Sequence, residues 1–140
     1  MAESMQKYIG KKYRLKSSEN FDEYLQFIGV GLFSRKTACA VTPICVLTRD
    51  GDKYTFTMST TFRTIVFTFK FNEEFEEERP DGYKVKSIVT VDGDVMTHTQ
   101  VESNGRKSVH TRTFSDNQLA TISSADGWDN KCVRIYEAIS

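Results

Sequence analysis

The sequence predicts an all-β protein in which about ten antiparallel strands close into a barrel. Three observations carry this prediction. Runs of alternating apolar and polar residues recur along most of the chain, as in 54–58 and 65–71. Asp-Gly or Asn-Gly pairs, typical of tight hairpins, separate these runs at 50–51, 92–93, 104–105 and 126–127. A single region, near the N-terminus, has a helical pattern instead.

That region predicts two short helices between the first and second strands. Asn20 is placed as the N-cap of the first helix, and acidic residues follow it in the first turn. Gly29 and Gly31 end this helix, because glycine favours the backbone conformation that terminates a helix. The second helix is expected over 32–40, before Pro43.

The remaining elements are strands. They are expected before the helices and then over 44–48, 54–58, 65–71, 83–91, 94–102, 107–114, 119–124 and in a last run that contains 133–137. The acidic run 73–78 is expected to be a short exposed strand and turn. A sheet of this size rarely stays open. Polar residues on both faces of the later strands, such as Thr97, Gln100 and Thr121, favour a barrel around a partly wet cavity over a solid core.

Composition bounds the function. We expect one domain over residues 1–140. The 19 basic and 19 acidic residues give zero net charge, which argues against nucleic-acid binding. No apolar run of about 18 residues and no signal-peptide pattern is seen, so a cytoplasmic location is expected. The three cysteines lack zinc or redox spacing, and neither a metal nor a cofactor is expected.

The run Val133–Tyr136 in the last strand leaves two interpretations open. Side chains alternate along a strand, so Arg134 and Tyr136 share one face while Val133 and Ile135 share the other. If the Arg134 face is internal, a permanent cation lies in the interior and requires an anion. If it is external, Val133 and Ile135 pack inside. The pattern alone favours neither interpretation.

A set of ordered motifs resembles the intracellular fatty acid-binding proteins of the calycin superfamily, and an invertebrate-like member in particular. These motifs are Tyr13–Leu25 with Gly29–Gly31, then Pro43, 61–63, 74–75, 84–87, 92–93 and Val133–Glu137. The resemblance covers essentially the whole chain. It implies a ten-stranded antiparallel β-clam with a helix-turn-helix lid between the first and second strands. It also implies that Arg112, Arg134 and Tyr136 hold a carboxylate inside the barrel, which favours the inward face.

The resemblance adds further candidates. Phe62 matches a position at the cavity opening, and Val30, Phe33 and Thr37 are placed on its helical side. The positions that match cavity-lining or ligand-contacting residues are Met58, Ile65, Pro80, Asp81, Gln100, Ser123, Phe21 and Pro43. For each of them ordinary packing is the alternative.

The expected function is reversible binding and transport of long-chain fatty acids by a monomer in the cytoplasm, with transient membrane contact through the helical lid. A carrier of a retinoid or another hydrophobic carboxylate would use the same three residues. An enzyme is not expected, because His98 and His110 have no nucleophile at motif spacing. A lipid-processing enzyme would need one of them beside a nucleophile inside the barrel. A lipid-dependent interaction protein acting through Arg35 and Lys36 is a further alternative.

Overall fold

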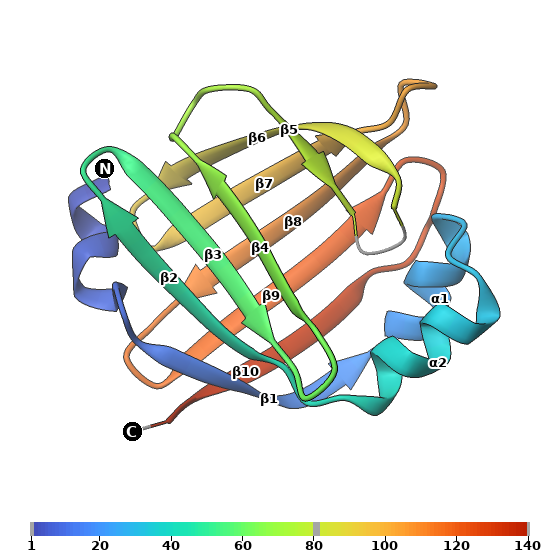
Figure 1. Ribbon diagram of the computed structural model, residues 1–140, viewed down its shortest axis with the longest axis horizontal. Coiled ribbons are helices and arrows are strands. Elements are labelled where there is room, and N and C mark those ends of the chain that lie inside the picture. Colours follow the sequence, from blue (N-terminus) through green and yellow to red (C-terminus); the bar gives the residue numbers. More distant parts are fainter. Residues whose placement is uncertain (1, 80–81, 140) are drawn as a thin grey trace.

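One antiparallel sheet of ten strands curls into a barrel, with two helices at one end (Figure 1). The computed structural model describes residues 2–79 and 82–139. The strands are β1 (Lys12–Glu19), β2 (Ile44–Asp50), β3 (Lys53–Ser59), β4 (Thr64–Phe69), β5 (Phe75–Glu78), β6 (Lys84–Asp92), β7 (Val95–Val101), β8 (Lys107–Phe114), β9 (Gln118–Ala125) and β10 (Cys132–Ile139). Their order in the sheet is β4-β3-β2-β1-β10-β9-β8-β7-β6-β5. The predicted ten-stranded barrel with a helical lid is confirmed.

The last strand resolves the open question about its two faces. Along β10, Cys132, Arg134 and Tyr136 are buried, whereas Val133 and Ile135 are only half-buried. The strand is flanked on both sides, by β1 and β9, so its inner face looks into the barrel. The Arg134 side chain therefore points inward.

The two helices follow β1, and α1 is tied to the barrel at both ends. They are α1 (Phe21–Phe27) and α2 (Leu32–Ala40). Asn20 precedes α1 as expected, but its side chain makes no cap hydrogen bond, because the residue adopts φ 62°. The Asn20 amide donates to the carbonyl of Lys131 at 2.9 Å instead. Asn20 is thus the N-cap residue as predicted, and its side chain links α1 to the loop before β10.

At its other end α1 meets Arg106, which follows the tip of the β7–β8 hairpin. The Arg106 guanidinium donates to the carbonyls of Phe27 at 3.2 Å and Ile28 at 3.1 Å. A cation at this position also complements the negative end of the helix dipole. Arg106 bonds the buried Glu102 carboxylate at 3.0 Å as well. This contact fixes the C-terminal end of α1 on the barrel.

The second helix is attached far more loosely. No residue of α2 is buried, and the Leu32 and Phe33 side chains are 58% and 84% exposed. Arg35 joins α2 to α1 through Asp22 at 3.0 Å. Among the described residues, no helix has the length and apolar character needed to cross a membrane.

A short 3-10 helix, η1 (Ala2–Tyr8), lies at the end of the barrel opposite α1 and α2 (Figure 1). It was not predicted. Its Met5 and Tyr8 side chains are almost fully buried in the main apolar cluster, which also contains Tyr13 and Phe114. The Tyr8 and Phe114 rings stack at 5.6 Å. The solid core therefore fills this end of the barrel, and the end beneath the helices is left for a cavity.

The acidic run before the sixth strand differs from its expectation. A strand forms there as β5, and its Glu76 and Glu78 are exposed as expected. The Glu77 side chain is only 9% exposed and points into the barrel, so the expectation of exposure was wrong at this residue. Strand alternation explains the difference, since Phe75 and Glu77 share a face.

Candidate functional site

A cavity of about 410 Å³ lies between the helices and the barrel wall. This volume is typical of a pocket for a small organic molecule. All predicted ligand-contacting residues in the described ranges line it: Arg112, Arg134, Tyr136, Phe62, Gln100, Met58, Ile65, Ser123, Phe21, Val30, Phe33, Thr37 and Pro43. Pro80 and Asp81 lie outside the described residues. Contact of these side chains with a ligand stays a prediction.

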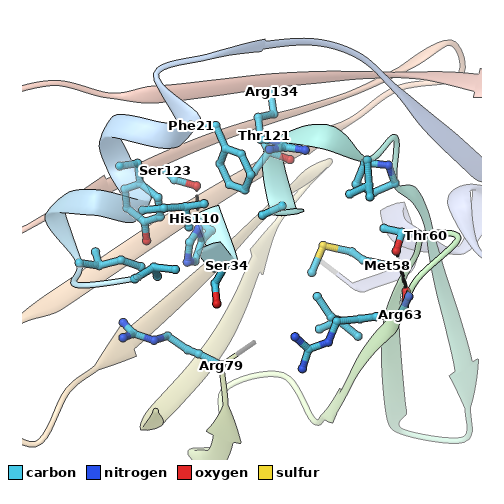
Figure 2. A pocket seen from close by; sticks show the side chains of 18 of the residues that line it. Phe21, Ser34, Met58, Thr60, Arg63, Arg79, His110, Thr121, Ser123 and Arg134 are labelled. Atoms are coloured by element: carbon cyan, nitrogen blue, oxygen red, sulfur yellow. Dashed lines mark hydrogen bonds between the residues drawn. The ribbon is translucent and has the colours of Figure 1, made fainter. Parts of the chain in front are cut away.

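The two cavity arginines lie on one rung of the sheet. Thr121 of β9 pairs with Arg134 of β10 on one side and with Arg112 of β8 on the other. All three side chains are buried and line the cavity. Figure 2 shows Arg134, Thr121 and Phe21 close together on one side of the cavity. The strand register therefore brings two guanidinium groups to the same wall, although the residues are far apart in the sequence.

Arg134 has an incomplete set of partners. Its side chain is 7% exposed, and its Nε has no hydrogen-bond partner. The guanidinium carbon lies 3.7 Å from the centroid of the Phe21 ring, so α1 supplies a cation–π contact. A buried donor without an acceptor is costly, and an anion would satisfy it.

Tyr136 lies two residues further along the same inner face. Burial, reinforced by the nearby Cys45 thiol, raises the pKa of the Tyr136 phenol to about 12. The phenol therefore keeps its proton at neutral pH and is available as an uncharged donor.

Arg112 is held between aromatic rings. Its guanidinium carbon lies 4.6 Å from the centroid of the Phe56 ring and 5.8 Å from that of Phe67. Its Nη1 donates to His98 Nδ1 at 3.2 Å. Burial lowers the pKa of Arg112, but a guanidinium keeps its charge in proteins. Arg112 is thus a fixed cation whose orientation is set by His98 and the two rings.

A second polar cluster, which the sequence interpretation missed, is centred on Glu77. Its Oε1 accepts hydrogen bonds from Ser87 at 2.8 Å, His98 at 2.8 Å and Gln100 at 3.2 Å. Next to it, His110 bonds Gln100 Oε1 at 2.9 Å and Ser123 Oγ at 2.7 Å. Strand alternation could have found the inward position of Glu77, but its acidic neighbours favoured an exposed run.

Arginines and one carboxylate, Glu77, supply the charges at the described part of the cavity wall. Burial raises the pKa of the Glu77 carboxyl, but the hydrogen bonds from His98, Gln100 and Ser87 outweigh burial and hold the pKa below its usual value. Glu77 is therefore anionic at neutral pH. The buried Arg79 is paired with Glu102 at 4.0 Å, and Arg63 is exposed. Among the described residues that line the cavity, guanidinium groups therefore outnumber carboxylates, which suits an anionic ligand.

The opening lies between α2 and the β3–β4 turn. Phe33 and Phe62 line the cavity, yet their side chains are 84% and 76% exposed. Met58, Thr60 and Arg63 lie on the side of the cavity near this turn (Figure 2). Within residues 2–79 and 82–139, no cluster of three or more His, Cys, Asp or Glu side chains could hold a metal ion.

Comparison with known proteins agrees with this architecture. Residues 10–136 match the model of the lipocalin / cytosolic fatty-acid binding protein family. A muscle fatty acid-binding protein of Schistocerca gregaria is 40% identical over 137 residues, covering 96% of this chain and 98% of that protein. Human cellular retinoic acid-binding protein 1 is 39% identical over 129 residues, covering 89% and 93%.

A solved structure gives the same result. The fatty acid-binding protein of Schistosoma mansoni in complex with arachidonic acid superimposes with a TM-score of 0.89 at 35% identity, over 98% of this chain and 99% of that one. The matches of sequence and structure both span nearly the whole chain. The chain therefore belongs to the lipocalin / cytosolic fatty-acid binding protein family.

Proposed function

We propose that this protein binds one long-chain fatty acid in its cavity and carries it through the cytoplasm as a single-domain monomer. The observation that supports the proposal best is the buried Arg134, whose Nε has no partner and which shares a rung with Arg112. In this proposal Arg134, Arg112 and Tyr136 hold the carboxylate. Relatives named for fatty acid binding, one of them described with arachidonic acid bound, support the choice of ligand.

Both parts of a fatty acid contribute to the binding energy. The guanidinium groups supply charge-assisted hydrogen bonds in a cavity of lowered dielectric. Each buried methylene contributes about 0.8 kcal/mol, so a long acyl chain gains roughly 10 kcal/mol before the loss of its freedom is subtracted. The apolar residues Met58, Ile65 and Phe67 line the wall that would receive the chain.

Release requires the opening to widen, and α2 is the element suited to move. Its residues are not buried, whereas α1 is tied at one end by Asn20 and at the other by Arg106. The exposed Leu32 and Phe33, with Lys36 on the same helix, would let α2 contact an anionic membrane during transfer.

A retinoid or another hydrophobic carboxylate is the second candidate ligand. Similarity to a protein named for retinoic acid binding favours it. The same arginines and tyrosine would serve, since the head group is again a carboxylate.

We do not propose an enzyme, although Ser123 lies 2.7 Å from His110. Burial, followed by the Arg112 charge, lowers the pKa of His110 well below its usual value, which makes it a weak general base. The Ser123 position is also paired in the β-ladder on both sides, with His110 and Cys132. Strand amides engaged in a ladder do not form an oxyanion hole.

Native mass spectrometry of the delipidated protein tests the proposal. The protein is reloaded with an equimolar mixture of oleic, arachidonic and retinoic acids. We expect a one-to-one complex whose released ligand has an unchanged mass, with a fatty acid retained in preference. Preferential retention of retinoic acid would select the second candidate. Failure to retain any acid, or release of a chemically altered one, would overturn the carrier function.

A further inference from the structure

The polar cluster around Glu77 is directional. Arg112 has donors only, so His98 Nδ1 must accept from it. Burial lowers the pKa of His98. The hydrogen bond to Glu77 raises this pKa and the Arg112 charge lowers it, but burial dominates, so the ring is neutral. A neutral ring that accepts at Nδ1 carries its proton on Nε2, and this proton is donated to Glu77. The first relay thus runs from Arg112 through His98 to Glu77.

A second relay ends on the same oxygen. The Gln100 amide nitrogen donates to Glu77 Oε1, which leaves the Gln100 carbonyl oxygen to accept from His110 Nε2. His110 Nδ1 then accepts from the Ser123 hydroxyl. Figure 2 shows His110 beside Ser123. Ser87 adds a third, direct donor at 2.8 Å. Both relays and the Ser87 hydroxyl therefore end on the same oxygen of Glu77, Oε1.

The other oxygen, Oε2, has none of these bonds. In the described part of the chain no side chain or backbone amide donates to it. Three described side-chain atoms are fully buried without a hydrogen-bond partner: Tyr24 Oη, Ser108 Oγ and Arg134 Nε. Oε2 of Glu77 is not one of them, so it keeps some accessible surface. Glu77 is nine-tenths buried and lines the cavity, so the surface left to Oε2 faces the cavity. An acceptor with a full negative charge is thus presented to the ligand.

We propose that Glu77 Oε2 accepts a hydrogen bond from a hydroxyl group on the acyl chain, so that the preferred ligand is a hydroxylated long-chain fatty acid. The inference rests on the proposed function, because the carboxylate of the same molecule occupies the Arg134 and Tyr136 site. A second carboxylate would be repelled by Glu77. A cationic group is disfavoured because Arg79, Arg112 and Arg134 line the same cavity. A neutral donor is the group that fits.

The chemistry of the acceptor gives a test that needs no variant. Dissociation constants are measured for octadecanoic acid, for its positional hydroxy isomers and for the matching keto isomers. We expect at least one hydroxy isomer to bind about tenfold more tightly than octadecanoic acid, since hydrogen bonds to charged groups are the strong ones. The keto acid with oxygen at the same carbon has no donor for Glu77 and should show no such gain.

The variant Glu77→Gln tests the residue itself. It should reduce the ratio of the two dissociation constants, octadecanoic acid over the best hydroxy isomer, from about ten to about one. The ratio is insensitive to any general loss of affinity. Glu76→Gln is the matched control, because Glu76 is exposed on the opposite face of β5 and pairs with Lys84 at 4.0 Å. Its ratio should equal that of the wild type.

The outcomes separate the two proposals. Binding of octadecanoic acid with no gain for any hydroxy isomer, or an equal gain for the keto isomer, would overturn the hydroxyl site and leave the carrier function intact. A ratio unchanged in Glu77→Gln would also overturn it. No binding of octadecanoic acid or of any isomer would overturn the carrier function itself. If Glu77→Gln does not fold, the hydroxy and keto comparison on the wild type still decides.

Discussion

The guanidinium carbon of Arg134 lies over the Phe21 ring, 3.7 Å from the ring centroid. The first residue of α1 therefore contacts the cation proposed to hold the ligand carboxylate. Phe21→Leu keeps the apolar bulk and removes the π face. In a double-mutant cycle with Arg134→Gln, we expect a coupling of about 1 kcal/mol in the free energy of unfolding. Additive effects of the two substitutions would show that the contact contributes nothing.

Arg134→Gln should distinguish head groups. It removes a charge that interacts with a carboxylate, so affinity for oleic acid should fall by about tenfold or more, whereas affinity for oleyl alcohol should change by less than about threefold. Competition with a fluorescent probe measures both. Arg14→Gln, at a half-exposed arginine paired with Glu137 on the outside of the barrel, is the control and should change neither affinity. Equal losses for acid and alcohol would contradict the head-group role.

Stability should depend on pH through the buried histidines. Burial, with the Arg112 charge, keeps the folded-state pKa of His110 well below its usual value, and burial lowers that of His98. Below about pH 6.5 the unfolded chain therefore binds more protons than the folded protein does. The contribution of these histidines to the free energy of unfolding is fully present above that pH. Below it, the free energy of unfolding falls by up to about 1.4 kcal/mol per pH unit for each histidine.

His110→Gln should make this dependence shallower. Urea unfolding at about pH 7.5 and about pH 5.5 measures it for wild type and variant. Since the chain has 2 histidines, the dependence that remains in the variant reports on His98. An identical slope in both proteins would mean that His110 titrates normally.

The Arg106 contact should stabilise the whole domain. Arg106→Leu frees the C-terminal carbonyls of α1 and removes the closest partner of the buried Glu102, so we expect a loss of about 2–3 kcal/mol in the free energy of unfolding. Amide hydrogens of α1 should also exchange faster. Arg14→Leu breaks a half-exposed pair whose atoms lie 3.8 Å apart and should cost less than about 1 kcal/mol. Similar losses in both variants would argue against a specific role for Arg106.

A substitution at Leu32 should separate the proposed membrane contact from ligand binding. Its side chain is 58% exposed on α2 and does not line the cavity. Leu32→Ser should slow the transfer of a fluorescent fatty acid to anionic vesicles by about threefold to tenfold while its dissociation constant stays the same. Ile122→Ser, at a 40% exposed residue on β9, is the control. An equal effect of both variants would locate the contact elsewhere.

The strands and helices were predictable because their signals are local. Local signals predict the alternating strand β3, the hairpin glycines and the helix over Leu32–Ala40. In the structure, α2 has these bounds. The helix η1 was missed, since it has no caps or helical period and forms only where Met5 and Tyr8 find an apolar barrel end. Its stability comes from tertiary packing.

The site was predictable only in part. Arg134 lies on a strand whose pattern alone did not decide which face is internal, so its predicted direction depended on the resemblance. Glu77 was misjudged because a carboxylate is usually exposed, and its partners Ser87, His98 and Gln100 come from strands that only the register brings together. Networks between distant strands have no local signal in the sequence.

The barrel has one seam that its backbone does not close. The strands β4 and β5 are the two ends of the sheet order and are not hydrogen-bonded to each other. Across the seam, the Phe67 and Phe75 rings lie 6.2 Å apart with planes at 14°, and Phe69 packs against Phe75 at 6.1 Å. A shift of these rings past one another breaks no ladder hydrogen bond, so a change in the girth of the barrel at this seam disturbs only side-chain contacts. Such a seam would let the barrel receive the proposed acyl ligands of different thickness without a change of fold.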